Sequence, residues 1–111
     1  MGLTQISDEG LKKPASDLQD NEKIVLGTHN DFEIYHDSGG DSFITESGGG
    51  PLIIRADGLQ LQRPNGNMYV KCFAGNKVEI YYDNARKFHT TTDGVTVTGT
   101  VTDSKGELRS I

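Results

Sequence analysis

A short strand-like segment occurs twice in this chain and sets the strongest limit on what the chain can fold into. Residues 32–37 read FEIYHD and residues 78–83 read VEIYYD. In each copy apolar and polar side chains alternate, which is typical of a strand with different side chains on its two faces. A second pair, DGLQL at residues 57–61 and DGVTV at residues 93–97, places an Asp-Gly turn before a short strand. Such repetition indicates stacked β units rather than an ordinary enzyme domain.

Turn residues divide the rest of the chain into short pieces. Asp57-Gly58 is a strong hairpin signal, and segments rich in Gly, Asn or Pro separate the other alternating stretches. The alternation predicts strands over residues 24–26, 32–36, 42–46, 52–55, 59–63, 68–73, 77–82, 87–91 and 95–102. Short strands at such regular spacing predict an all-β chain with an elongated, repetitive β-structure.

The apolar content is low for a domain that folds alone. Leu, Ile, Val and Phe make up about 23% of the 111 residues, just above the roughly 20% typical of disordered chains. A domain of this size buries a limited share of its surface, so contacts between copies are the simplest source of further burial. We therefore expect an oligomer, and the alternative is a small monomeric β-domain with a polar surface.

The last predicted strand favours contact around a symmetry axis. Val95, Val97, Gly99 and Val101 alternate with threonines, so one face carries only small apolar groups. Such a narrow face suits close approach to identical strands. Together with the apolar positions of the repeat, it predicts the core of a homotrimer, either triple β-helix-like or built of stacked β units, formed by Phe32, Ile34, Val78, Ile80, Val95, Val97 and Val101.

Composition changes divide the chain into three expected parts. Residues 1–22 are polar and lack alternation, which indicates an N-terminal arm or linker. Residues 23–94 form the repetitive β-domain, and residues 95–111 form a C-terminal strand or stalk segment.

Charge and cysteine content weigh against several partners. The formal net charge is −5, and nucleic-acid binding is driven by Lys and Arg, so we expect no nucleic-acid partner. No apolar run reaches the length that a membrane span needs, so we expect no membrane insertion. The single cysteine, Cys72, alternates with Met68 and Val70 and is interpreted as a small buried hydrophobic residue.

Two longer segments resemble proteins of a known class. NEKIVLGTHNDFEIYHDSGG at residues 21–40 and VEIYYDNARKFHTTTDGVTVTGTV at residues 78–101 resemble a recurrent stretch in tail-fibre and virion structural proteins of tailed bacteriophages. The joint occurrence of IVLGT, DFEIYHD and VEIYYDNARKF followed by TTDGVTVTG carries the resemblance over residues 21–101. It implies an elongated homotrimer of wrapped chains attached to a virion, where other virion proteins are its partners, and it implies recognition of a host-surface glycan or protein. The end of the chain, SKGELRSI, resembles a junction to a further module.

The repeated acids and the histidines are the candidate sites of catalysis or metal binding. A glycosidase needs two carboxylates flanking one bond, but Glu33, Asp37, Glu79 and Asp83 lie at equivalent points of a repeat, where acids are usually solvated. His36 shares a face with Phe32 and Ile34, so three copies on a trimer axis could hold a metal ion. Its repeat mate is Tyr82, however, so both rings could equally border a core. Residues 37–41 loosely resemble a calcium loop without its closing acids.

The tyrosines are the best candidates for a binding role. Each offers a flat apolar ring and a hydroxyl group, and Tyr35 and Tyr81 hold equivalent places in the two repeat copies. We expect them to be the contacts for a receptor or glycan. No catalytic, cofactor-binding or metal-binding residue is assigned.

These observations predict a non-enzymatic structural component of a phage tail fibre or related virion appendage. It would be made in the host cytoplasm, would act by mechanical display, and would contribute to host-surface recognition. The alternatives are a polysaccharide-degrading fibre module and a carbohydrate-binding β-domain.

Overall fold

The computed structural model of the chain describes residues 17–106. All regular elements in this range are strands, which confirms the predicted all-β class. Most of the expected N-terminal arm and the end of the chain at residues 107–111 lie outside the described residues. The strands are β1 (Lys23–Leu26), β2 (Phe32–His36), β3 (Ser42–Glu46), β4 (Leu59–Gln62), β5 (Met68–Cys72), β6 (Val78–Tyr82), β7 (Ala85–Thr91) and β8 (Gly94–Val97).

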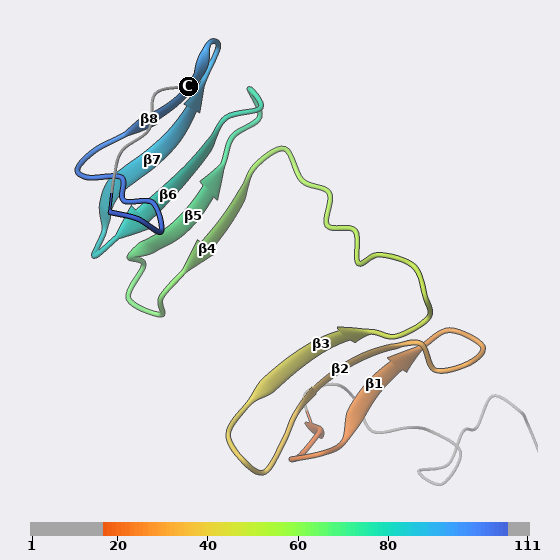
Figure 1. Cartoon of the computed structure of the whole chain (residues 1–111). Coiled ribbons are helices and arrows are strands. Elements are labelled where there is room, and N and C mark those ends of the chain that lie inside the picture. The colour runs from red at the N-terminus through yellow and green to blue at the C-terminus, as the bar shows by residue number, and fades with distance from the viewer. Residues whose placement is uncertain (1–16, 107–111) are drawn as a thin grey trace, which may run out of the picture. The chain divides into compact units, whose positions relative to one another are not determined.

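The strands form two antiparallel sheets in two separate units (Figure 1). The first unit, Met1–Ile53, holds a sheet of order β1-β2-β3, and the second, Ile54–Ile111, holds a sheet of order β4-β5-β6-β7-β8. In both sheets each strand pairs with its neighbours in sequence. The two repeat copies become β2 and β6, which are the middle strands of their sheets.

The predicted turn residues supply the backbone shapes that the hairpins need. The β2–β3, β4–β5 and β5–β6 turns each place one residue in the left-handed region, and these residues are Gly40, Gly66 and Asn76. The β6–β7 turn places both Asp83 (φ 50°) and Asn84 (φ 62°) there. Positive φ at both central residues is the mark of the tight two-residue turn that matches the twist of a hairpin.

One of the predicted strands is absent from the structure. Residues 52–55 form no strand: Pro51 cannot donate a backbone hydrogen bond, and Leu52, Ile53 and Ile54 are all exposed. Asp57-Gly58 is consequently a bend before β4 and not a hairpin turn. A boundary between units therefore falls where the sequence analysis expected a continuous domain over residues 23–94.

The last strand is shorter than predicted and belongs to the second sheet. β8 pairs with β7 and ends at Val97, although the backbone N–H of Thr98 still donates to the carbonyl of Lys87 at 2.8 Å. Gly99 then adopts φ +114°, which turns the chain out of the extended conformation. Val101 thus lies beyond the strand, and the expected separate segment beginning at residue 95 is wrong.

Neither sheet has a buried apolar core within a single chain. No hydrophobic side chain among the described residues is buried. Register nevertheless gathers the apolar side chains on one face of each sheet, because Ile24, Ile34 and Ile44 oppose one another across all three strands of the first sheet. In the second sheet a row crosses all five strands, made of Leu61, Val70, Ile80, Phe88 and Val97.

Candidate functional site

Each sheet presents one face of apolar side chains, and these faces are the first candidate surface. The first apolar face is formed by Ile24, Leu26, Phe32, Ile34 and Ile44, and the second by Leu59, Leu61, Val70, Cys72, Val78, Ile80, Phe88, Val95 and Val97. Ile34 and Ile80 lie on the middle strands, yet they remain 37% and 43% exposed. Middle positions are normally the best covered in a sheet, so both faces are open in one chain.

Six of the seven residues expected to form a trimer core lie on these faces. Phe32 and Ile34 are on the first face, and Val78, Ile80, Val95 and Val97 are on the second. Val101 is not, because the chain leaves the strand before it. The two groups lie in different units, two residues on the first sheet and four on the second. Contact between symmetry mates stays a prediction.

The opposite face of the second sheet carries a buried carboxylate. Glu79 is only 4% exposed, and it is the one buried residue among those described. The expectation that Glu79 is solvated is therefore wrong. It accepts hydrogen bonds from the Tyr81 hydroxyl at 2.5 Å and from Arg86 Nη1 at 2.7 Å, and Lys77 Nζ lies 3.2 Å away. A carboxylate can be buried at this point because these three side chains cover it and supply its hydrogen bonds.

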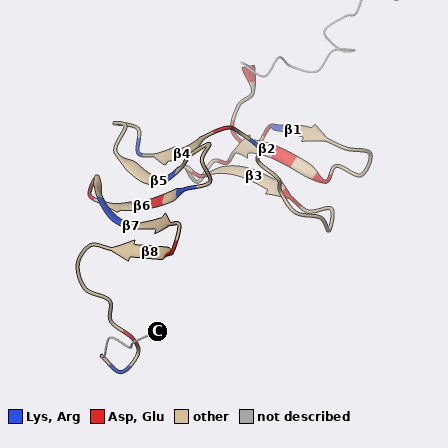
Figure 2. Cartoon of the chain, turned by 90° about the horizontal axis from the view of Figure 1, so that it is seen from above, with Lys and Arg blue, Asp and Glu red and all other residues tan. Residues whose placement is uncertain are grey.

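These contacts change the ionisation of both partners. The hydrogen bond from Tyr81, followed by that from Arg86, lowers the pKa of Glu79 from 4.5 to about 2, although burial opposes this shift. The same hydrogen bond raises the pKa of the Tyr81 hydroxyl above its ordinary value. Glu79 is thus a charged acceptor at neutral pH, and the Tyr81 hydroxyl is held as its donor. Figure 2 shows an acidic position on β6 and basic residues at the start of β7, the neighbouring strand.

The equivalent residues of the first sheet make a more open cluster. Lys23 Nζ lies 3.0 Å from Glu33 Oε1 and 4.5 Å from the centre of the Tyr35 ring. The Tyr35 ring also stacks on Phe43, with a centroid distance of 4.9 Å. Both copies of the repeat therefore surround the glutamate with a cation and a tyrosine from the same strand. The Tyr35 ring, however, already stacks on Phe43 and lies under the Lys23 ammonium group.

The two predicted binding tyrosines belong to different units, Tyr35 to the first and Tyr81 to the second. Within the second unit, Tyr81 lies with Tyr69 and Tyr82. At the end of the second sheet, a hollow of about 510 Å³ receives three tyrosines. We call it the tyrosine groove, and its lining residues are Arg63, Asn67, Met68, Tyr69, Tyr81, Tyr82, Asp83 and Asn84.

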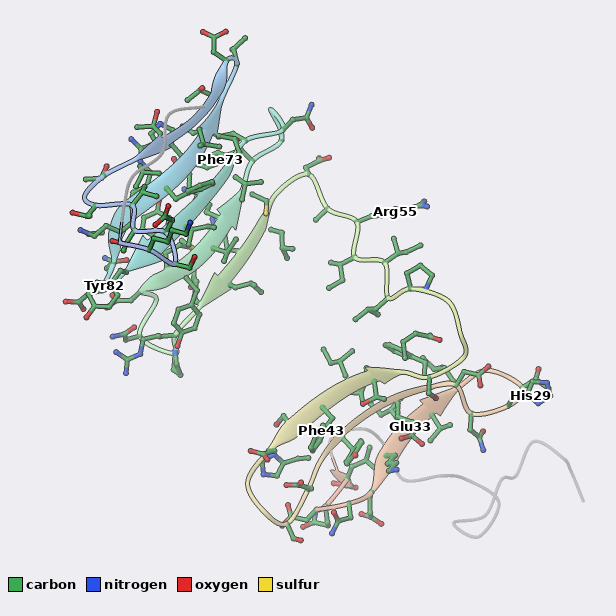
Figure 3. The ribbon with its side chains drawn as sticks, in the orientation of Figure 1. His29, Glu33, Phe43, Arg55, Phe73 and Tyr82 are labelled. Atoms are coloured by element: carbon green, nitrogen blue, oxygen red, sulfur yellow. The ribbon has the colours of Figure 1, made fainter. Side chains whose placement is uncertain are left out.

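Turn chemistry assembles the tyrosine groove. The β6–β7 turn brings Asn84 next to β5, where its side-chain oxygen accepts a hydrogen bond from the Met68 backbone N–H at 3.0 Å. Tyr82 is 74% exposed. It lies at the end of β6, where Figure 3 labels its side chain. Tyr69 and Tyr82 were not predicted from the sequence as members of a site. The signal that could have found them is the position of both next to Asn-containing turns.

The histidines and the aspartate turn do not gather into a metal site. His29 lies in the β1–β2 loop (Figure 3), and His36 Nδ1 lies 2.8 Å from the Ser42 hydroxyl. His89 opposes Glu79 across β6 and β7. Asp37 Oδ1 accepts the backbone N–H groups of Gly39 and Asp41, so the loop over residues 37–41 uses this carboxylate to hold its own turn. Over residues 17–106, no group of three or more His, Cys, Asp or Glu side chains could hold a metal ion.

Comparisons with known proteins place the chain in no family. No family model, no curated protein and no solved structure matches it. Among the described residues there is also no helix long and apolar enough to span a membrane.

Proposed function

We propose that this chain is a structural β-module of a phage tail fibre or related virion appendage, in which three copies assemble through the apolar faces of their sheets. Its role is mechanical display with a contribution to host-surface recognition, and its place is the virion. The observation that carries the proposal is the pair of apolar faces left open on sheets that lack a buried core.

The free energy of burying apolar side chains favours an assembly of several copies over a single chain. A small sheet with one apolar face is stable only when another layer covers that face. The first face offers apolar side chains from three strands, and the second offers them from five. Burial of such a side chain is favourable by about 1.5–3 kcal/mol when it goes from exposed to covered. Identical copies are the simplest cover, because each copy carries the same open faces.

The resemblance to tail-fibre proteins selects the kind of assembly. The IVLGT, DFEIYHD and VEIYYDNARKF segments map onto β1, β2 and the β6–β7 hairpin, and β2 and β6 are the middle strands of their sheets. The segments that carry the resemblance therefore contribute side chains to both apolar faces. A polysaccharide-degrading module is the alternative, and release of reducing sugar ends from a polysaccharide would distinguish it from a display module.

A charge placed on the second apolar face tests the proposal. Val97 lies in the row that crosses all five strands, whereas Thr96 lies on the opposite face, next to His89. In a trimer, Val97→Asp would bring three carboxylates into a covered apolar layer, which is costly. We expect Val97→Asp to abolish the trimer on size-exclusion chromatography and Thr96→Asp to retain it. A Val97→Asp protein that still elutes as a trimer would contradict the proposed interface.

A further inference from the structure

The tyrosine groove has the composition and size of a small-ligand site. Its volume of about 510 Å³ lies within the roughly 300–1,000 Å³ range typical of such sites. Tyr69 and Tyr82 are both more than half exposed there, so their rings are open to a ligand. A hollow of this size has room for a small molecule or for one segment of a polymer.

One aromatic wall of the groove is already fixed in position. The Tyr81 hydroxyl is held by Glu79, and Glu79 is in turn held by Arg86 and Lys77. The ring of Tyr81 is therefore ordered before any ligand arrives. Ordering a contact side chain in advance removes part of the entropic cost of binding. The buried Glu79 cluster thus acts as a support that positions Tyr81 in the groove.

The polar groups of the groove suit a neutral ligand rich in hydroxyls. The side chain of Asn67 contributes an amide donor and a carbonyl oxygen, and Asn84 contributes its amide donor, because its oxygen already accepts a hydrogen bond from Met68. Arg63 and Asp83 add one positive and one negative group, so the lining as a whole does not select for an anion or a cation. A flat apolar face bordered by hydroxyls is the chemistry that tyrosine rings and amides recognise together. A pyranose ring presents that combination.

We propose that the tyrosine groove binds a neutral pyranose saccharide, whose ring stacks on the exposed ring of Tyr82 while its hydroxyls bond to the side-chain amides of Asn67 and Asn84. The inference deepens the display role proposed above, because it names the class of host-surface ligand. It does not depend on assembly, since every lining residue belongs to one chain.

NMR titration of the full chain with neutral disaccharides tests this site. The probes are disaccharides containing glucose, galactose, mannose or N-acetylglucosamine, and sorbitol serves as an acyclic polyol that has hydroxyls but no ring face. We expect saturable amide shifts at Tyr69, Tyr82 and Asn84 with at least one disaccharide and none with sorbitol. Absence of saturable shifts with every disaccharide would overturn the proposal and favour a protein contact at this surface. Equal shifts with sorbitol would overturn it as well.

Variants of Tyr82 distinguish stacking on its ring from unspecific effects of a substitution in this sheet. Because stacking uses the ring face, Tyr82→Ala should weaken binding about tenfold or more, whereas Tyr82→Phe should stay within about threefold of the parent. Gln60→Ala is the control, because Gln60 is exposed in the same sheet but outside the groove. Equal affinity of Tyr82→Ala and the parent would contradict the site. If the protein is a monomer and binds saccharide, the proposed trimer is refuted and the saccharide site stands. If the protein is a trimer and binds no saccharide, the saccharide site is refuted and the proposed trimer stands.

Discussion

Truncation of Ile80 measures how much of the second apolar face is covered in solution. The side chain lies at the centre of the five-strand row and is 43% exposed in one chain, so a little over half of it is already covered. A fully covered Ile→Ala change costs about 2–5 kcal/mol. If the face stays open, the cost of Ile80→Ala should scale with the covered part of the side chain, to roughly 1–3 kcal/mol. In an assembled trimer, where the face is covered, we expect Ile80→Ala to cost the full amount of about 2–5 kcal/mol in each chain.

The chain offers a control of the same residue type. Ile53 is 62% exposed on the segment between the sheets and belongs to no strand, so Ile53→Ala should cost less than about 0.5 kcal/mol. Urea unfolding followed by circular dichroism, at several protein concentrations, gives the difference. A trimer must also become more stable as its concentration rises. The reasoning is refuted if Ile80→Ala costs no more than Ile53→Ala at every concentration.

Three further predictions concern the first sheet, the buried carboxylate and the β6–β7 turn. Ile34→Ala should destabilise by about 2–5 kcal/mol when the first apolar face is covered, measured by the same unfolding assay, and a loss equal to that of Ile53→Ala would refute this. The folded-state pKa of Glu79, about 2, lies below its ordinary 4.5, so its stabilisation is present above pH 4.5 and is lost as the pH falls towards 2. Urea midpoints across this range should fall less for Glu79→Gln than for the parent, and parallel curves would contradict the assignment. Asn84→Gly keeps the left-handed backbone but loses the bond to Met68, at about 0.5–1.5 kcal/mol, whereas Asn84→Ala adds the strain of a left-handed alanine, roughly 1–2 kcal/mol; equal unfolding midpoints would show that the turn geometry does not matter.

Local patterns in the sequence predicted the strands and turns well, because both depend on neighbouring residues. Alternation located β2, β3 and β6 within a residue of their ends. Gly and Asn residues marked the turns that need a left-handed backbone, as at Gly66 and Asn76. The segment over residues 52–55 was wrong because alternation cannot show whether a partner strand exists. Pro51 was the one local sign against it.

The candidate sites depended on contacts that local patterns do not contain. Burial of Glu79 requires Arg86 from β7, and only the register of the hairpin places that guanidinium beside the carboxylate. The tyrosine groove likewise combines the β4–β5 turn with the end of β6. Repeat symmetry suggested that Tyr35 and Tyr81 are equivalent. Their neighbours differ, because Phe43 stacks on one ring and Glu79 bonds to the hydroxyl of the other.

The mass of the native particle tests the central claim most directly. The open apolar faces on both sheets should drive three chains together, so light scattering coupled to size exclusion should give three times the 12.1 kDa chain mass at micromolar concentration. On dilution, the measured mass should stay constant down to the concentration at which the trimer dissociates. A particle of one chain mass at these concentrations would contradict the trimer and with it the account of the apolar faces.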